Sequence, residues 1–138
     1  MIILDTDVLS ALMRPDREPS VVRWLDGQPA DSIWITSITL FESRLGLALL
    51  AKGRRRRTLE DAFERLLNDH LQNRMLEFDA PAAIEAASLA ASRHRAGRPV
   101  DIRDTQIAGI AQARRATLAT RNVHHFSDLR IPVVDPWS

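Results

Sequence analysis

The chain has 138 residues, of which 45% are hydrophobic and 27% are charged, and we expect one folded domain over residues 1–138. This composition excludes a mainly disordered or fibrous protein, the absence of cysteine excludes disulfides and thiolate metal sites, and the net charge of +1 excludes a uniformly basic surface. The N-terminus does not resemble a signal peptide, and no apolar run is long enough to span a membrane. We therefore expect a cytoplasmic protein without membrane association.

The hydrophobic pattern predicts short strands that alternate with helices. Strands are predicted at 2–4, 33–36, 75–78, 117–120 and 131–134, and helices at 8–13, 21–25, 37–51, 54–73, 79–95 and 102–115. This alternation is typical of an α/β fold in which helices cover a parallel sheet, here of about five strands.

The helix predicted at 37–51 carries apolar residues at three- and four-residue spacing. This stripe predicts the face that packs on the core, and Glu42 falls within it on the helical wheel. The stripe consists of Ile38, Phe41, Leu45, Ala48 and Leu49. A buried carboxylate costs several kcal/mol unless it is paired or binds a metal. Glu42 is therefore either the partner of an arginine such as Arg121 or an inward-facing metal ligand.

Further acidic residues lie where ligands bind in open parallel sheets, beyond the carboxyl ends of the strands. Asp5 directly follows the first strand, although Asp5 or Asp7 is also suited to cap the next helix. Asp104 lies in the first turn of the helix predicted at 102–115 and faces inward. Asp101, three residues earlier, is either the N-cap of that helix or a further ligand.

Asp5, Glu42 and Asp104 come from three separate segments, and each is expected to point toward the same end of the sheet. Carboxylates that approach one another repel and resist ionisation unless a cation lies between them. Mg²⁺ and Mn²⁺ prefer oxygen ligands, and open water positions on such an ion allow the hydrolysis of phosphate esters. The sequence therefore predicts a Mg²⁺ (or Mn²⁺) site with hydrolytic chemistry.

Four short segments and the C-terminal tail carry a resemblance to a known family. They are Ile-Leu-Asp-Thr-Asp-Val at 3–8, Thr-Leu-Phe-Glu-Ser-Arg-Leu-Gly at 39–46, Arg-Asp-Thr-Gln-Ile-Ala at 103–108, Leu-Ala-Thr-Arg-Asn at 118–122 and the tail 126–137. On these the chain resembles PIN-domain ribonucleases, in particular VapC-type toxins and the related FitB-like proteins of bacterial toxin–antitoxin systems. The resemblance implies a three-layer α/β/α PIN-like fold and a metal-dependent RNA endonuclease that hydrolyses phosphodiesters with a metal-activated water.

The resemblance also implies roles for the acidic residues. Asp5, Glu42 and Asp104 would bind the metal and, with Asn122, form the catalytic set. Asn122 stands where many family members carry a fourth acid, so one-metal and two-metal mechanisms both stay open. Asp7 departs from the more usual asparagine, and we assign it a structural role in the turn.

Supporting roles are expected for polar residues beside the acids. Thr6 and Thr120 would position water or phosphate through their hydroxyls, or else cap the backbone at strand ends. Arg121 would contact the scissile phosphate or neutralise the acids. A run of four arginines at a predicted helix start is either a solvated face or an RNA-phosphate contact: Arg54, Arg55, Arg56 and Arg57.

Partners follow from the resemblance alone. It implies a cognate VapB/FitA-like antitoxin, whose C-terminal segment would wrap the toxin and often places an arginine among the metal-site acids. It also implies an RNA substrate and a homodimer.

Two other functions are compatible with the sequence. Asp5-Thr6-Asp7-Val8 after a strand mimics the Asp-x-Asp motif of haloacid-dehalogenase-like phosphatases, with Asp5 as the nucleophile, but that chemistry needs a lysine and Lys52 is the only one. The second alternative is a non-catalytic binding module in which the acids pair with arginines, for example Glu42 with Arg121.

Overall fold

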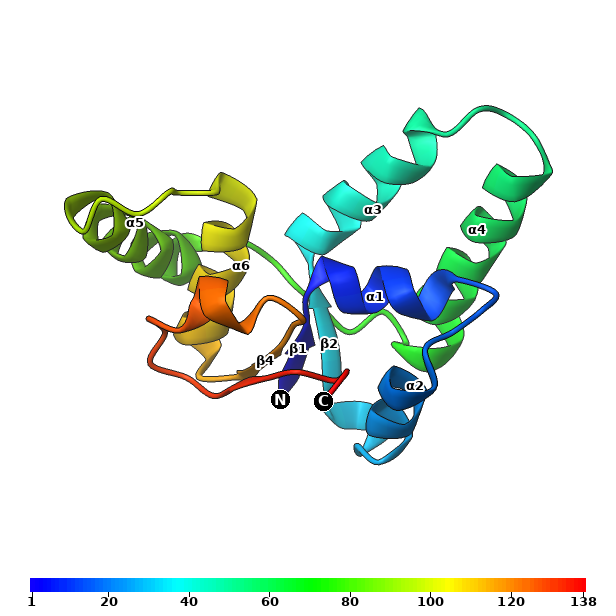
Figure 1. Ribbon diagram of the computed structural model, residues 1–138, viewed down its shortest axis with the longest axis horizontal. Helices are drawn as coiled ribbons and strands as arrows, with labels where there is room; N and C mark the ends of the chain where they lie inside the picture. The colour runs from blue at the N-terminus through cyan, green and yellow to red at the C-terminus, as the bar shows by residue number, and fades with distance from the viewer.

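The computed structural model describes residues 1–138 and has a five-stranded sheet at its centre (Figure 1). The strands are β1 (Ile2–Leu4), β2 (Ile33–Thr36), β3 (Met75–Leu76), β4 (Thr117–Ala119) and β5 (Val133–Val134). Their order is β3-β2-β1-β4-β5, and every neighbouring pair is parallel. The predicted parallel sheet of five strands is confirmed, although β3 and β5 are shorter than the predicted segments.

Helices cover both faces of this sheet. They are α1 (Thr6–Met13), α2 (Pro19–Asp26), α3 (Ser37–Leu49), α4 (Arg54–Arg65), α5 (Ala80–Arg95) and α6 (Ile102–Arg114). A π-helical segment over Leu66–His70 extends α4, and a 3₁₀ turn over Val123–Phe126 follows β4. Figure 1 shows α1, α2 and α4 on one side of the sheet and α5 and α6 on the other, which gives three layers. None of these helices has the length and apolar character needed to cross a membrane.

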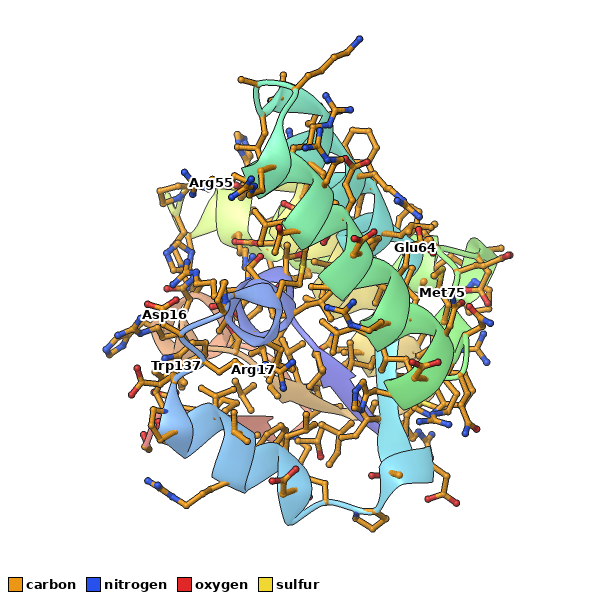
Figure 2. The ribbon with its side chains drawn as sticks, turned by 90° about the vertical axis from the view of Figure 1, so that its right-hand side faces the viewer. Asp16, Arg17, Arg55, Glu64, Met75 and Trp137 are labelled. Atoms are coloured by element: carbon orange, nitrogen blue, oxygen red, sulfur yellow. The ribbon has the colours of Figure 1, made fainter.

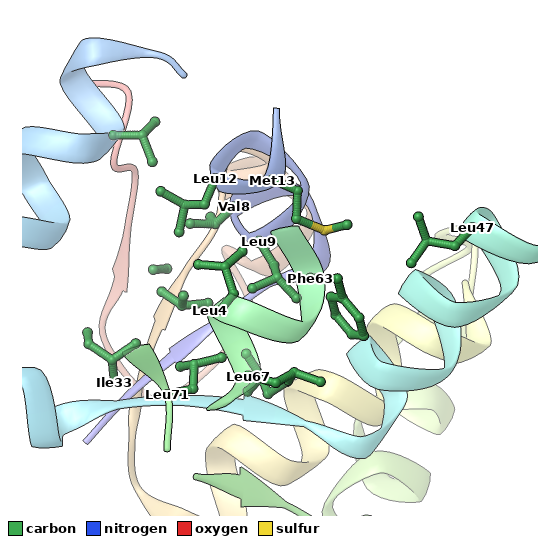
Figure 3. Close-up of a cluster of buried hydrophobic side chains, with 14 residues drawn as sticks. Leu4, Val8, Leu9, Leu12, Met13, Ile33, Leu47, Phe63, Leu67 and Leu71 are labelled. Carbon is green, nitrogen blue, oxygen red and sulfur yellow. The ribbon is translucent and has the colours of Figure 1, made fainter. Parts of the chain in front are cut away.

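The side chains of the strands alternate between two hydrophobic cores, as the twofold period of a strand requires. Leu4 and Ala119 belong to the core shared with α1, α2 and α4, whereas Ile3 and Leu118 belong to the core shared with α5 and α6. Figure 3 shows the first core, in which Phe63 of α4 is fully buried. Continuous apolar strands are therefore buried on both faces, as is usual for parallel sheets.

Helices α5 and α6 pack closely because small residues face one another. A Cβ atom added at Gly109 of α6 would lie 2.6 Å from the carbonyl oxygen of Ala82 and 2.7 Å from the Cβ of Ala86, both in α5. This close approach fixes α6 against the sheet. It thereby fixes the first turn of α6, which carries Asp104.

The predicted inward face of α3 is wrong in part. Phe41 is 56% exposed and Leu49 is 77% exposed, whereas the buried residues of α3 are Thr39, Ser43 and Leu47. Of the predicted stripe, Ile38 is partly buried and packs on the core shared with α5 and α6. The N-terminal half of α3 packs beside α1 through polar side chains, so most of the apolar stripe lies away from the core.

Candidate active site

Asp5 lies at the carboxyl end of β1, at the centre of the sheet, and is buried. Its Oδ1 accepts a hydrogen bond from the backbone N–H of Thr6 at 2.9 Å, and its Oδ2 accepts one from the Thr120 hydroxyl at 2.8 Å. Asp5 is thus the N-cap of α1, as one of the two interpretations of the sequence predicted. The bond from Thr120 also orients its carboxylate at the end of the neighbouring strand β4.

Glu42 is half-buried on α3, and a threonine hydroxyl orients its carboxylate. The Thr6 hydroxyl donates to Glu42 Oε1 at 2.7 Å, and Thr6 Oγ1 lies 2.9 Å from Thr39 Oγ1. Since Thr6 has one hydroxyl proton and gives it to Glu42, Thr39 must donate to Thr6. The chain of hydroxyls therefore runs from the buried Thr39 through Thr6 to the carboxylate.

Asp104 is half-buried in the first turn of α6, and its backbone N–H donates to Asp101 Oδ1 at 3.1 Å. This bond makes Asp101 the N-cap of α6, and Asp101 is exposed to solvent. The sequence left Asp101 either as the N-cap or as a further ligand, and in the structure it is the N-cap.

Burial, with repulsion from neighbouring acids, raises the pKa values of Asp5 and Asp104. Burial raises the pKa of Asp5 to about 7, and repulsion from Asp7 and Asp104 adds to the effect, while hydrogen bonds from Thr120 and Thr6 oppose it. Burial also raises the pKa of Asp104, with further repulsion from Asp101 and Glu42. Asp5, Glu42 and Asp104 therefore share one electrostatic environment, in which a cation is favoured and a negative ligand alone is not.

The same acids do not form a closed ligand cage. No group of three or more acidic or histidine side chains converges closely enough to hold a metal ion. Their carboxylates border an open acidic site, so a cation there would depend on water for part of its coordination, as Mg²⁺ commonly does.

The predicted ion pair between Glu42 and Arg121 is absent. Glu42 Oε2 instead faces Arg103 Nη1 of α6 at 3.6 Å, and the Arg121 guanidinium packs over Trp137, 4.9 Å from the ring centroid. The backbone N–H of Arg121 donates to Asp7 Oδ2 at 3.0 Å. Asp7 thus joins α1 to the segment after β4, in agreement with the structural role assigned to it.

Asn122 lies in the turn directly after Arg121. Its backbone N–H donates to Thr120 Oγ1 at 3.1 Å, so the Thr120 hydroxyl accepts from Asn122 and donates to Asp5. Both threonines that were expected to contact water or phosphate hold acids in this structure: Thr6 holds Glu42, and Thr120 holds Asp5.

The predicted arginine run begins α4, and its members differ in their surroundings. Arg54 and Arg55 line a cavity of about 730 Å³ that also includes Thr6 and Glu42. Figure 2 shows Arg55 at the start of α4 and Asp16, another lining residue, on the same side of the molecule. Arg56 forms an ion pair with Glu60 at 3.2 Å and donates to a backbone carbonyl, and Arg57 is exposed. One cavity therefore connects Glu42, the only one of the three acids that lines it, with two of the four arginines.

Two residues of the site were missed in the sequence. Thr39 is fully buried beneath Thr6, and Arg103 is the ion-pair partner of Glu42. The three-residue spacing from Thr39 to Glu42 was the available signal, because it puts both side chains near one face of a helix. The apolar stripe on the outer face of α3 obscured it.

Comparisons with known proteins agree with this architecture. The PIN domain family model matches residues 2–131. Toxin FitB of Neisseria gonorrhoeae is 34% identical over 137 residues, which cover 99% of each chain. VapC ribonuclease Y4jK of Sinorhizobium fredii is 32% identical over 137 residues, 99% of this chain and 98% of the relative. A chain in the crystal structure of FitAcB from Neisseria gonorrhoeae matches with a TM-score of 0.89 and 34% identity, over 99% of both chains. The protein with this acidic site therefore belongs to the PIN-domain family, in the group of VapC-type and FitB toxins.

Proposed function

We propose that the protein is a Mg²⁺- or Mn²⁺-dependent RNA endonuclease and the toxin of a toxin–antitoxin pair. The observation that carries this proposal is the cluster of three carboxylates at the carboxyl ends of the strands, two of them held by threonine hydroxyls: Asp5, Glu42 and Asp104. The relative named VapC ribonuclease supports the choice of RNA as the substrate.

Asp5, Glu42 and Asp104 would hold the cation. All their donor atoms are carboxylate oxygens, which suit Mg²⁺ and Mn²⁺, and an oxygen that accepts one hydrogen bond keeps a lone pair for a further partner. Because the pKa of Asp5 is raised to about 7, this buried carboxyl is partly protonated near neutral pH and would have to lose that proton to bind a cation. When bound, such a cation supplies Lewis-acid charge and lowers the pKa of water beside the phosphodiester.

The protein contributes orientation. Thr39 and Thr6 fix the rotamer of Glu42, and Thr120 fixes Asp5, so that the acids need little rearrangement when a cation and a phosphate arrive. Asn122 would add a neutral amide that orients water or a phosphate oxygen without adding charge.

The cavity between the acids and the arginine run would hold RNA. Its lining passes from Thr6 and Glu42 to Arg54 and Arg55, so a strand whose scissile phosphate lies at the acids has basic side chains beside its flanking phosphates. Arg57 is exposed on the same first turn of α4 and would add to this field, whereas Arg56 is held by Glu60.

The antitoxin is proposed from the structural relatives. The similar solved structures are named FitAcB and VapBC2, names that join a toxin with its antitoxin. A VapB/FitA-like partner is therefore proposed for this chain. A homodimer is also proposed, because the family resemblance implies one. Co-purification with a co-expressed VapB/FitA-like antitoxin, and light scattering of the free protein, would measure the two associations.

The other two functions are less well supported. Membership of the PIN-domain family does not favour a haloacid-dehalogenase-like phosphatase, and Lys52 lies exposed between α3 and α4. The binding module requires the acids to pair with arginines. Glu42 faces Arg103 at 3.6 Å, but Asp5 and Asp104 form no ion pair, so only one of the three acids fits this alternative.

The test is cleavage of end-labelled total RNA by the purified, antitoxin-free protein with Mg²⁺, Mn²⁺ or EDTA. We expect discrete products with either metal and none with EDTA or with Asp5→Asn. Cleavage that persists in EDTA would contradict a metal mechanism, and a phosphoaspartate trapped at Asp5 without RNA cleavage would establish the phosphatase instead.

A further inference from the structure

We propose that Arg103 exchanges partners during the reaction: it is the counter-ion of Glu42 in the metal-free protein and binds a phosphate of the RNA once the cation is in place. This inference rests on the proposed function and adds a substrate-binding residue to it. The starting observation is that Arg103 Nη1 lies 3.6 Å from Glu42 Oε2, across the mouth of the acidic site.

The ion pair is loose. A separation of 3.6 Å exceeds the usual N–H···O hydrogen-bond distance, and the Arg103 side chain is 47% exposed. Arg93 shows the opposite case: it is buried, donates to both Asp128 oxygens at 2.9 and 3.0 Å and also donates to the His125 carbonyl. Arg93 is fixed by these bonds, whereas the donors of Arg103 are available for a ligand.

An aromatic ring holds Arg103 at the site without using its N–H groups. The guanidinium carbon lies 5.5 Å from the ring centroid of Phe41, which precedes Glu42 on α3 and is 56% exposed. A guanidinium on an aromatic face keeps its edge donors directed outward. Phe41 therefore keeps the cationic group beside Glu42 and leaves its planar fork open to solvent, which also gives this exposed aromatic residue a function.

A bound cation would change what Arg103 faces. A divalent ion on Glu42 neutralises the charge that attracts the guanidinium and repels it at short range. A phosphodiester at the site brings new negative charge, and the planar fork of arginine suits phosphate oxygens. Arg103 is the residue placed for this exchange, since no other arginine forms an ion pair with one of the three acids.

Arg103→Gln tests the exchange, with Arg44→Gln as a matched control. Arg44 belongs to α3, and its guanidinium carbon lies 4.8 Å from the ring centroid of Phe63. Its side chain is 47% exposed, like that of Arg103, but its ion-pair partner is Glu64, which is not one of the three acids. We would titrate each RNA-free protein with Mn²⁺ and then measure kcat and KM for RNA. Arg103→Gln should bind Mn²⁺ several-fold more tightly because a competing cation is gone, and its kcat/KM should fall about 10- to 100-fold through loss of a charged hydrogen bond.

Arg103→Lys separates charge from shape. It should restore the weaker Mn²⁺ binding of the wild type, since the positive charge remains, but only part of kcat/KM, since the planar fork is lost. Equal Mn²⁺ affinity and equal kcat/KM in wild type, Arg103→Gln and Arg44→Gln would overturn the proposal. The Mn²⁺ titration uses no RNA, so it tests the counter-ion role of Arg103 even if the wild type fails to cleave, an outcome that would count against the proposed function instead. Unchanged Mn²⁺ affinity in Arg103→Gln would by itself overturn the exchange.

Discussion

Hydroxyl groups orient two of the three acids at the carboxyl end of the sheet. Thr120 donates to Asp5 and Thr6 donates to Glu42, and each bond orients a carboxylate without neutralising it. A buried arginine beside Asp5 would offset the desolvation of the carboxylate but would also compete with a cation. The hydroxyls therefore leave the carboxylates free for a cation. Burial without a cationic partner raises the pKa of Asp5, although the hydrogen bond from Thr120 lowers it.

The first prediction concerns stability against pH in the metal-free protein. The pKa of Asp5 is about 7 in the folded state against 3.8 as the ordinary value, so between these limits the unfolded chain loses a proton that the folded protein keeps. The free energy of unfolding should therefore fall as pH rises from about 4 to 7, by up to about 4 kcal/mol. Urea unfolding in EDTA at a series of pH values measures this free energy. Asp5→Asn should flatten the profile and be more stable than the wild type at pH 8; an unchanged profile would refute this origin.

The second prediction concerns the hydroxyl that orients Asp5. Thr120→Val keeps the shape of the buried side chain but removes the donor, so affinity for Mn²⁺ should fall about 10- to 100-fold. Thr117→Val is the matched control, because it makes the same change at the other end of β4. Isothermal titration compares the two variants. Equal affinities would show that Asp5 does not need the hydroxyl.

At the residue scale, the sequence was sufficient to locate the acids but not to define their contacts. Asp5 was located by its place after a strand. Glu42 was selected from an apolar stripe that proves to be largely exposed on α3, and it is half-buried beside the polar residues Thr39 and Ser43. Hydroxyl contacts such as Thr6 with Thr39 join residues 33 positions apart, and no local pattern encodes such a pair.

At the element scale, small residues between α5 and α6 position Asp104. The two helices approach closely at Gly109, next to Ala82 and Ala86, and α6 starts with its cap at Asp101. Apolar periodicity predicted both helices to within a few residues because their buried faces are continuous. For α3 the same periodicity predicted the helix, at 37–51 against the observed Ser37–Leu49, but not its buried face, which is polar in the first two turns through Thr39 and Ser43.

The third prediction tests this packing. Gly109→Ala forces a Cβ to within 2.6 Å of the Ala82 carbonyl oxygen, so the helices must separate and the protein should lose about 1 to 3 kcal/mol of stability. Gly46→Ala in α3 meets nothing within 4 Å and should gain up to about 1 kcal/mol from helix propensity. Thermal unfolding shows whether each variant is more or less stable than the wild type. A Gly109→Ala protein as stable as the wild type would contradict the close packing.

At the scale of the whole molecule, the parallel sheet brings distant segments together. Asp5 and Thr120 are 115 positions apart, yet they meet because β1 and β4 are neighbours that end at the same edge. Alternating strands and helices predicted the parallel sheet, and with it the edge at which the acids lie. They did not predict the strand order or the cavity that joins Glu42 to Arg54, since both depend on how the helices pack.

The most direct measurement of the central claim is the rate of metal-dependent RNA cleavage by Asp104→Asn and Asp101→Asn. The two variants make the same change three residues apart on α6, and asparagine remains a good N-cap at position 101. If the acidic cluster performs the chemistry, Asp104→Asn abolishes cleavage with Mg²⁺ and Mn²⁺, while Asp101→Asn keeps most of the wild-type rate. Cleavage by a folded Asp104→Asn protein at the wild-type rate would contradict the account.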